Sequence, residues 1–402
     1  MTGHLTIIMA AVVQPASPIW GESLSRLDLP VMVRATIYCG TFALLRILAL
    51  TGLLALSSPA MAATLEEMAG QMIVVGFEGS SATDPSVEAM AKEIAEGRLG
   101  GVMYLKKNVK SLGAVRAMNE AFRAASPELP PFITLDQEGG AVERLTKDVG
   151  FREIPNAATI ARNNRPDEAE AIYAQMASGI ADLGFTVNFG PVADLNTNPN
   201  NLVIAKYGRA FSDDPQTVIA YDEAFITAHH AAGLITALKH FPGHGSSTAD
   251  SHEGFVDITK TWQADELEPY RVLISEKLAD MVMVGHLYHA DYANGDGETP
   301  SSLSSRWIDG VLRTDLGFDG VVISDDLEMG AIREHFTLEE TVTKAVRAGM
   351  DILLFSNTAK YRPGLSGEIL AILLAEAEAD PAFAARIEES YNRIVALKQR
   401  IE

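Results

Sequence analysis

Residues 234–245 read Leu-Ile-Thr-Ala-Leu-Lys-His-Phe-Pro-Gly-His-Gly, a largely apolar run that ends in ionisable residues and glycines. Short runs of this kind are typical of strands buried on both faces, as in a parallel sheet covered by helices. Similar runs lie on either side of it in the sequence. Together with 234–240 they give eight predicted strands, at residues 71–77, 101–105, 132–136, 185–192, 281–286, 320–324 and 351–356.

Helical patterns separate these runs. Asp84 and Pro85 predict a helix start, because Asp is a favoured N-cap residue and Pro fits the first turn. Val87, Met90 and Ile94 then repeat at helical spacing. Comparable stripes are Leu112, Val115, Met118 and Phe122, then Val342, Ala345 and Val346, and finally Phe383, Ile387, Tyr391 and Ile394.

Eight strand and helix units over residues 63–402 predict a single-domain α/β fold, a (β/α)8 TIM-type barrel. An open, doubly wound sheet is the alternative fold. The first predicted strand is not followed by a Gly-x-Gly-x-x-Gly loop, so nucleotide binding has no support.

Composition limits the partners of the chain. Its 32 Lys and Arg residues face 53 Asp and Glu residues, a formal net charge of −21, which argues against a nucleic-acid partner because such proteins neutralise phosphates with basic side chains. Hydrophobic residues make up 47% of the chain and charged residues 21%, as in globular proteins with a packed core.

Residues 1–62 are interpreted as an N-terminal extension and a signal peptide. A short apolar run after Arg34 and Arg46 ends in Ala60-Met61-Ala62, the small-x-small pattern of a cleavage site. We expect cleavage after Ala62, a periplasmic or secreted protein rather than a cytoplasmic one, and no stable membrane association. A retained membrane anchor is the alternative, and the start codon is either Met1 or Met32. The single cysteine, Cys39, lies in this segment and cannot form an intramolecular disulfide.

Ionisable residues follow the predicted strands where each one ends. Active sites of such barrels lie at these carboxyl ends, so we expect the side chains to converge on one rim. They are Asp136 and Arg144 after the third strand, Asp194 and Arg209 after the fourth, Lys239, His240, His244, Asp250 and His252 after the fifth, His286 after the sixth, and Asp325 and Asp326 after the seventh.

Taken singly, these residues have structural interpretations. Asp194 or Asp326 could be helix N-caps, and His229-His230 reads as a pair of helix histidines with structural partners. As a set they indicate function, because burying so many unpaired charges is costly. Two chemistries could use them. One is metal-assisted hydrolysis with His240, His244, His252 and a carboxylate as ligands. The other is glycoside hydrolysis, which needs a carboxylate nucleophile, a proton donor and polar groups that bind sugar hydroxyls.

The residues of the rim resemble a known family. Lys-His-Phe-Pro-Gly-His-Gly at 239–245 with Asp-Ser-His at 250–252, Asp-Gln-Glu-Gly-Gly at 136–140 and Ser-Asp-Asp at 324–326 are similar to the β-N-acetylhexosaminidases of glycoside hydrolase family 3. The resemblance covers roughly residues 65–397. It implies a retaining exo-β-N-acetylglucosaminidase in which Asp325 is the nucleophile, His252 the general acid/base and Asp250 its partner.

The resemblance also implies that Asp136, Arg144, Arg209, Lys239 and His240 bind the sugar and that neither a metal nor a cofactor is needed. The partner would be a small oligosaccharide with a terminal N-acetylglucosamine, either a peptidoglycan fragment or a chitooligosaccharide. Single-domain bacterial relatives are cytoplasmic enzymes of peptidoglycan recycling, whereas this chain has a predicted signal peptide. The alternatives are a family 3 β-glucosidase or xylosidase and a sugar-binding barrel without activity.

Three further expectations concern geometry. Successive side chains at a strand end point to opposite sides, so only one of Asp325 and Asp326 should face the barrel axis. The Gly, Ser and Thr residues between His244 and Thr248 predict a mobile loop before His252. Glu138 is the second candidate for the proton donor.

Overall fold

Eight short, fully buried parallel strands form one sheet in the computed structural model, which describes residues 63–401 apart from residues 127 and 296. The strands are β1 (Ile73–Gly76), β2 (Gly101–Met103), β3 (Phe132–Leu135), β4 (Val187–Asn188), β5 (Ile235–Phe241), β6 (Met281–Val284), β7 (Val321–Ser324) and β8 (Leu353–Phe355).

The sheet closes on itself. Its order is β7-β6-β5-β4-β3-β2-β1-β8, and the two ends meet through a parallel bridge between Ile323 and Ile352. The amide of Ser324 donates a hydrogen bond of 3.0 Å to the carbonyl oxygen of Ile352. The predicted (β/α)8 barrel is therefore confirmed, and each of the eight predicted runs contains one strand or most of its residues.

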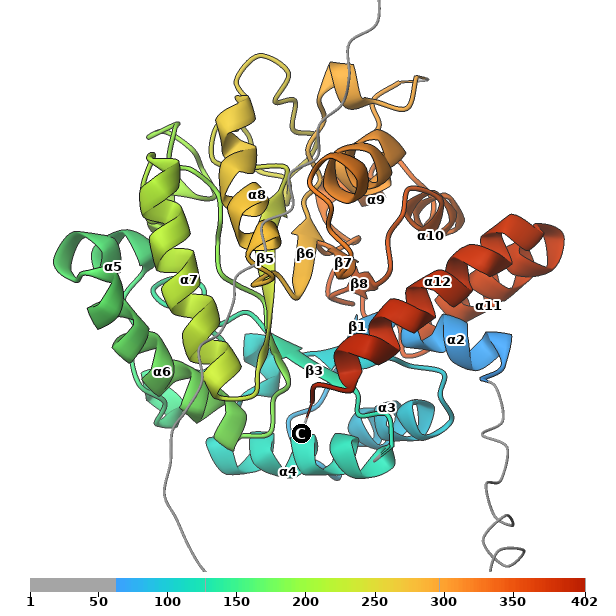
Figure 1. Ribbon diagram of the computed structural model, residues 1–402. Coiled ribbons are helices and arrows are strands. Elements are labelled where there is room, and N and C mark those ends of the chain that lie inside the picture. Colours follow the sequence, from blue (N-terminus) through green and yellow to red (C-terminus); the bar gives the residue numbers. More distant parts are fainter. Residues whose placement is uncertain (1–62, 127, 296, 402) are drawn as a thin grey trace, which may run out of the picture. The chain divides into compact units, whose positions relative to one another are not determined.

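Helices surround the strands (Figure 1). The α-helices are α2 (Leu65–Gln71), α3 (Pro85–Ala95), α4 (Leu112–Ala125), α5 (Ala157–Asn163), α6 (Pro166–Asp182), α7 (Pro215–Ala231), α8 (Glu268–Ser275), α9 (Gly330–Arg333), α10 (Leu338–Arg347), α11 (Leu365–Ala379) and α12 (Pro381–Lys398). Short 3-10 helices are η1 (Lys106–Asn108), η2 (Lys147–Val149), η3 (Ala205–Tyr207), η4 (Ala264–Leu267), η5 (Ala290–Tyr292) and η6 (Ser301–Leu303), and η7 (Arg306–Asp315) is a π-helix.

Helix α3 shows how the sequence pattern becomes structure. Val87, Met90 and Ile94 form its buried stripe, as predicted. Asp84 occupies the N-cap position, but its Oδ2 accepts hydrogen bonds from the amides of Ser80 and Ser81, at 2.7 and 3.0 Å, and none from the helix. The expected side-chain cap is therefore replaced by a turn that shapes the preceding loop.

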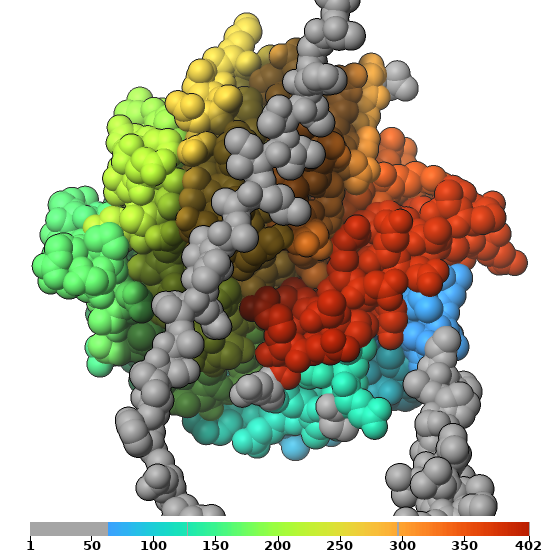
Figure 2. Space-filling view, in the orientation of Figure 1, coloured from blue at the N-terminus to red at the C-terminus, as the bar shows by residue number. Residues whose placement is uncertain are grey.

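Ion pairs and a hydrogen bond connect the last helix, α12, to residues near the amino ends of the strands. The buried carboxylate of Asp351, just before β8, accepts hydrogen bonds from Arg386 and Arg393 of α12 and from Arg313 of η7, at 2.7, 3.2 and 2.6 Å. The ammonium of Lys398 donates to the side chain of Gln71 in α2 at 2.7 Å. Figure 2 shows α12 in red beside α2 in blue. These contacts lie at the end of the barrel opposite the predicted rim.

Among residues 63–401, with the two gaps noted, we find no helix with the length and apolar character needed to cross a bilayer. The predicted signal peptide and its cleavage site after Ala62 lie outside the described residues.

Candidate active site

A cavity of about 350 Å³ opens at the carboxyl ends of the strands. Its walls include most of the residues predicted for the site, namely Asp136, Arg144, Arg209, Lys239, His240, His252 and Asp325. Asp250 is the exception, and it is hydrogen-bonded to His252. Apolar side chains complete the lining, namely Met103, Leu105, Val142, Val203, Met283 and Met329. The predicted convergence on one rim is thus what the structure shows.

Five charged side chains form a network on one side of this cavity. Asp136, just after β3, accepts hydrogen bonds from Arg144 and Lys239, both at 2.8 Å. Arg209 forms a two-pronged pair with Glu138, at 2.8 and 2.9 Å, and Lys239 lies 2.7 Å from the same carboxylate. Burial would raise the pKa of Glu138, but Arg209 and Lys239 hold that pKa well below its usual range. The network therefore presents fixed, charged donors to a ligand, and Glu138 is a poor proton donor.

The carboxylate of Asp194 orients His240, although the sequence also allowed Asp194 to be a helix N-cap. Its Nδ1 lies 2.7 Å from Oδ2 of Asp194, and its Nε2 lies 3.3 Å from the guanidinium of Arg209, which can only donate. His240 therefore donates from Nδ1. The other oxygen of Asp194 accepts from the amides of His240 and His244, at 3.2 and 2.7 Å. Asp194 is not a helix cap but the support of the segment after β5.

Asp325 and Asp326 follow β7, and their pKa values are shifted in opposite directions. Although burial opposes it, the imidazoles of His240, His286 and His252 lower the pKa of Asp325 to about 2. Burial raises the pKa of Asp326 to about 6, and the Oδ1 of Asp326 accepts from the amides of Ser356 and Glu328. Both residues line the cavity, and the expectation that only one carboxylate faces the barrel axis stays a prediction. Their partners nevertheless separate them, and Asp325 is the more firmly ionised carboxylate.

His252 lies on the loop after β5 with Asp250 as its partner. Its Nδ1 is 2.8 Å from Oδ1 of Asp250, which also accepts the amide of His252 at 2.9 Å. The His252 side chain is 62% exposed, and its Nε2 has no hydrogen-bond partner in the described part of the chain. A carboxylate on one ring nitrogen fixes the tautomer and leaves the other nitrogen for proton transfer.

The histidines do not gather into a metal site. Both ring nitrogens of His244 are engaged, by Ser247 at 2.6 Å and Ser251 at 3.2 Å, and His240 is bonded to Asp194. Nowhere in residues 63–401, gaps excepted, do three or more His, Cys, Asp or Glu side chains have an arrangement that could hold a metal ion. The alternative of metal-assisted hydrolysis therefore lacks a ligand set there.

Other histidines are structural, as the sequence suggested. In α7, His229 stacks on Phe225 and lies 2.9 Å from the side-chain nitrogen of Asn188, while His230 is 2.7 Å from Asp280. The loop that is expected to be mobile begins with a buried segment. His244 to Ser247 are buried. The side-chain amide of Asn201 donates hydrogen bonds to backbone carbonyls of this segment, at 2.8 Å to that of His244.

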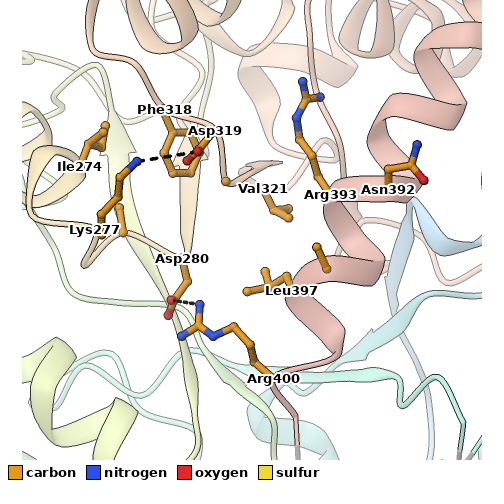
Figure 3. Close-up of a pocket in the computed structure, with 13 residues that line it drawn as sticks. Ile274, Lys277, Asp280, Phe318, Asp319, Val321, Asn392, Arg393, Leu397 and Arg400 are labelled. Carbon is orange, nitrogen blue, oxygen red and sulfur yellow. Dashed lines mark hydrogen bonds and ion pairs between the residues drawn. The ribbon is translucent and has the colours of Figure 1, made fainter.

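A second cavity, of about 470 Å³, lies at the opposite end of the barrel, beside α12 (Figure 3). Its charged side chains are held in ion pairs: Arg400 with Asp280 at 2.6 Å, Lys277 with Asp319 at 3.7 Å, and Arg393 with Asp351 at 3.2 Å. Barrel enzymes place their chemistry at the carboxyl ends of the strands. The smaller cavity is therefore the candidate active site.

Stability should depend on pH through Glu266, a buried residue in η4 beneath Gly243. Burial raises the pKa of Glu266 to about 7. The folded state keeps the proton that the unfolded state releases, so stability falls as pH rises from about 4.5 to 7. We expect Glu266→Gln to lessen the loss of unfolding free energy between pH 5 and pH 8 by about 2 kcal/mol in urea titrations. Glu120→Gln, at an exposed position, is the control, and equal pH profiles for the two variants would contradict this assignment.

The sequence of the chain is similar to those of known glycoside hydrolases. The model of the glycosyl hydrolase family 3 N-terminal domain matches residues 64–397. A Beta-hexosaminidase of Stenotrophomonas maltophilia strain R551-3 is 34% identical over 292 residues, which cover 70% of this chain and 82% of that protein. Beta-hexosaminidase A of Pseudoalteromonas piscicida is 31% identical over 325 residues, 75% of this chain.

A solved structure gives the same result. The family 3 β-N-acetylglucosaminidase from Paenibacillus sp. FPU-7 superposes with a TM-score of 0.76 and 32% identity over 84% of this chain. The chain spans 63% of that protein and 54% of the Pseudoalteromonas relative. Fold, sequence and cavity thus agree, and the chain belongs to glycosyl hydrolase family 3.

Proposed function

We propose that this chain is a retaining exo-β-N-acetylglucosaminidase that removes terminal β-linked N-acetylglucosamine from small oligosaccharides. One observation carries the proposal. A firmly ionised carboxylate, Asp325, and an imidazole held by a carboxylate, His252, line the same cavity. The names of the relatives, β-hexosaminidases and a β-N-acetylglucosaminidase, support this substrate class.

In the first step, an oxygen of Asp325 attacks the anomeric carbon and forms a glycosyl ester, while the glycosidic bond breaks. The leaving oxygen takes the proton from Nε2 of His252. In the second step, His252 accepts a proton from water, the hydroxide attacks the same carbon, and Asp325 departs as a carboxylate. Two displacements retain the configuration. Asp250 stabilises the imidazolium form of His252, which is present before the first displacement and again after the second.

Sugar binding is assigned to the charged network. Lys239, Arg144 and Arg209 supply charge-assisted donors toward the hydroxyls and the acetamido group. Their mutual pairs with Asp136 and Glu138 fix these donors before the sugar arrives. Less reorganisation is then needed on binding, which favours catalysis.

The proposal is tested by comparing substrates. We expect hydrolysis of a nitrophenyl β-N-acetylglucosaminide and little of the matching β-glucoside or β-xyloside. Preference for the glucoside or xyloside would favour a different branch of the family, and binding without turnover would favour a sugar-binding barrel. Activity should survive prolonged chelation, and its loss would restore the metal hypothesis. Muropeptides and chitooligosaccharides are then compared as natural substrates.

We also propose that the protein is exported and cleaved after Ala62, on the basis of the Ala60-Met61-Ala62 pattern. The mature protein should be found in the periplasm or medium, with Ala63 as its first residue in amino-terminal sequencing. Recovery of a cytosolic protein that retains residues 32–62 would contradict this prediction.

A further inference from the structure

In the loop that carries the proposed acid, residues 246–254, Ser251 is buried between two less buried neighbours. Ser251 is 1% exposed, although Asp250 precedes it and the exposed His252 follows it. A single buried hydroxyl of this kind needs partners, since an unpaired buried polar group is costly. Its partner on the barrel side is His244.

His244 contacts the loop with both of its ring nitrogens. Nδ1 lies 2.6 Å from Oγ of Ser247, and Nε2 lies 3.2 Å from Oγ of Ser251. Burial lowers the pKa of His244 to about 4, so the ring is neutral near pH 7, with one donor and one acceptor nitrogen.

The hydrogen bonds around Ser247 assign the tautomer of that ring. Oγ of Ser247 accepts from the side chain of Asn201 at 3.0 Å. The hydroxyl proton of Ser247 can go to Nδ1 of His244 at 2.6 Å or to the carbonyl of Ala249 at 3.4 Å, and the shorter contact is the stronger. Nδ1 then accepts, and Nε2 carries the proton and donates it to Ser251.

The opposite side of the loop is held by the start of α9. The amide of Ala331 donates to the carbonyl oxygen of Ser251 at 3.1 Å, and the amide of Gly330 donates to that of His252 at 3.2 Å. A side chain at Gly330 would bring a Cβ to 2.8 Å from the same carbonyl oxygen. The loop is thus fixed by its backbone on one side and by the hydroxyl of Ser251 on the other.

We propose that His244 and Ser251 form a latch that positions His252 for proton transfer. The inference rests on the proposed function, because His252 must act as the acid. The latch touches neither Nδ1 nor Nε2 of His252. It sets the direction of the neighbouring residue in the chain, so His244 acts as a positioning residue.

Ser251→Ala removes the latch hydroxyl and leaves the side chains of His252 and Asp250 chemically unchanged. Proton donation matters for a sugar leaving group but little for a dinitrophenolate, which departs unprotonated. We expect kcat to fall at least about tenfold on N,N′-diacetylchitobiose and less than about threefold on the dinitrophenyl glycoside. His244→Ala should show the same pattern, and His244→Gln, whose amide can reach Ser251, should lose less. Thr248→Ala, at an exposed position of the same loop, is the matched control.

Hydrogen exchange of the 248–254 peptide provides a readout that does not depend on activity. Exchange should be faster in Ser251→Ala and His244→Ala than in the wild type and unchanged in Thr248→Ala. Equal hydrogen exchange in the wild type and Ser251→Ala overturns the latch. This result does not depend on activity, so it is distinct from a failure of the proposed function, which would appear as a wild type that hydrolyses no N-acetylglucosaminide. In an active enzyme, an equal loss on both substrates also overturns it.

Discussion

Asp325→Asn or Asp325→Ala is expected to reduce turnover by at least about a thousandfold while the fold persists. Neither replacement can form the glycosyl ester, and the surrounding imidazoles of His240, His286 and His252 show that the site is built for a negative charge there. Steady-state kinetics on the nitrophenyl glycoside measure the loss, and circular dichroism checks the fold.

Asp326→Asn is the matched control for this prediction. Its carboxylate is occupied by the amides of Ser356 and Glu328, so the variant should keep much more activity. A fluorinated sugar that traps the intermediate should label Asp325 in peptide mass mapping. Labelling of Asp326 would reverse the assignment of the two residues.

His252→Ala is expected to lose about a hundredfold or more in kcat on a disaccharide and much less on a nitrophenyl glycoside. The reason is the leaving group, since a sugar alkoxide must be protonated as it departs and a nitrophenolate need not be. Asp250→Asn should follow the same trend more weakly, because it keeps the imidazole but weakens the hold on Nδ1.

Equal losses on both substrates would show that His252 positions the sugar. The proton donor would then lie elsewhere on the rim. Glu138 is unsuited to replace it, because Arg209 and Lys239 hold its carboxylate ionised.

The barrel was predictable because its signal is local. Each strand is buried on both faces, so each appears in the sequence as a short apolar run, and each run ends at the same rim. The family resemblance implied the roles of Asp325 and His252. The structure shows that both residues line one cavity but does not by itself assign these roles.

The hydrogen-bond partners of the site residues were not predictable in the same way. Asp194 reads equally well as a helix cap, and its contact with His240 joins residues 46 positions apart in the chain. The Gly, Ser and Thr composition after His244 suggested an exposed, mobile loop. Residues 244–247 are instead buried, and they accept hydrogen bonds from the side-chain amide of Asn201 in another loop. Such contacts depend on tertiary structure, and no local pattern in the sequence signals them.

The contact of Lys398 with Gln71 has a consequence for synthesis. It joins residues 327 positions apart, and the pairing of β1 with β8 likewise needs the last part of the chain. A ribosome must therefore translate nearly all of the protein before the barrel can close, and until then strand edges remain unpaired.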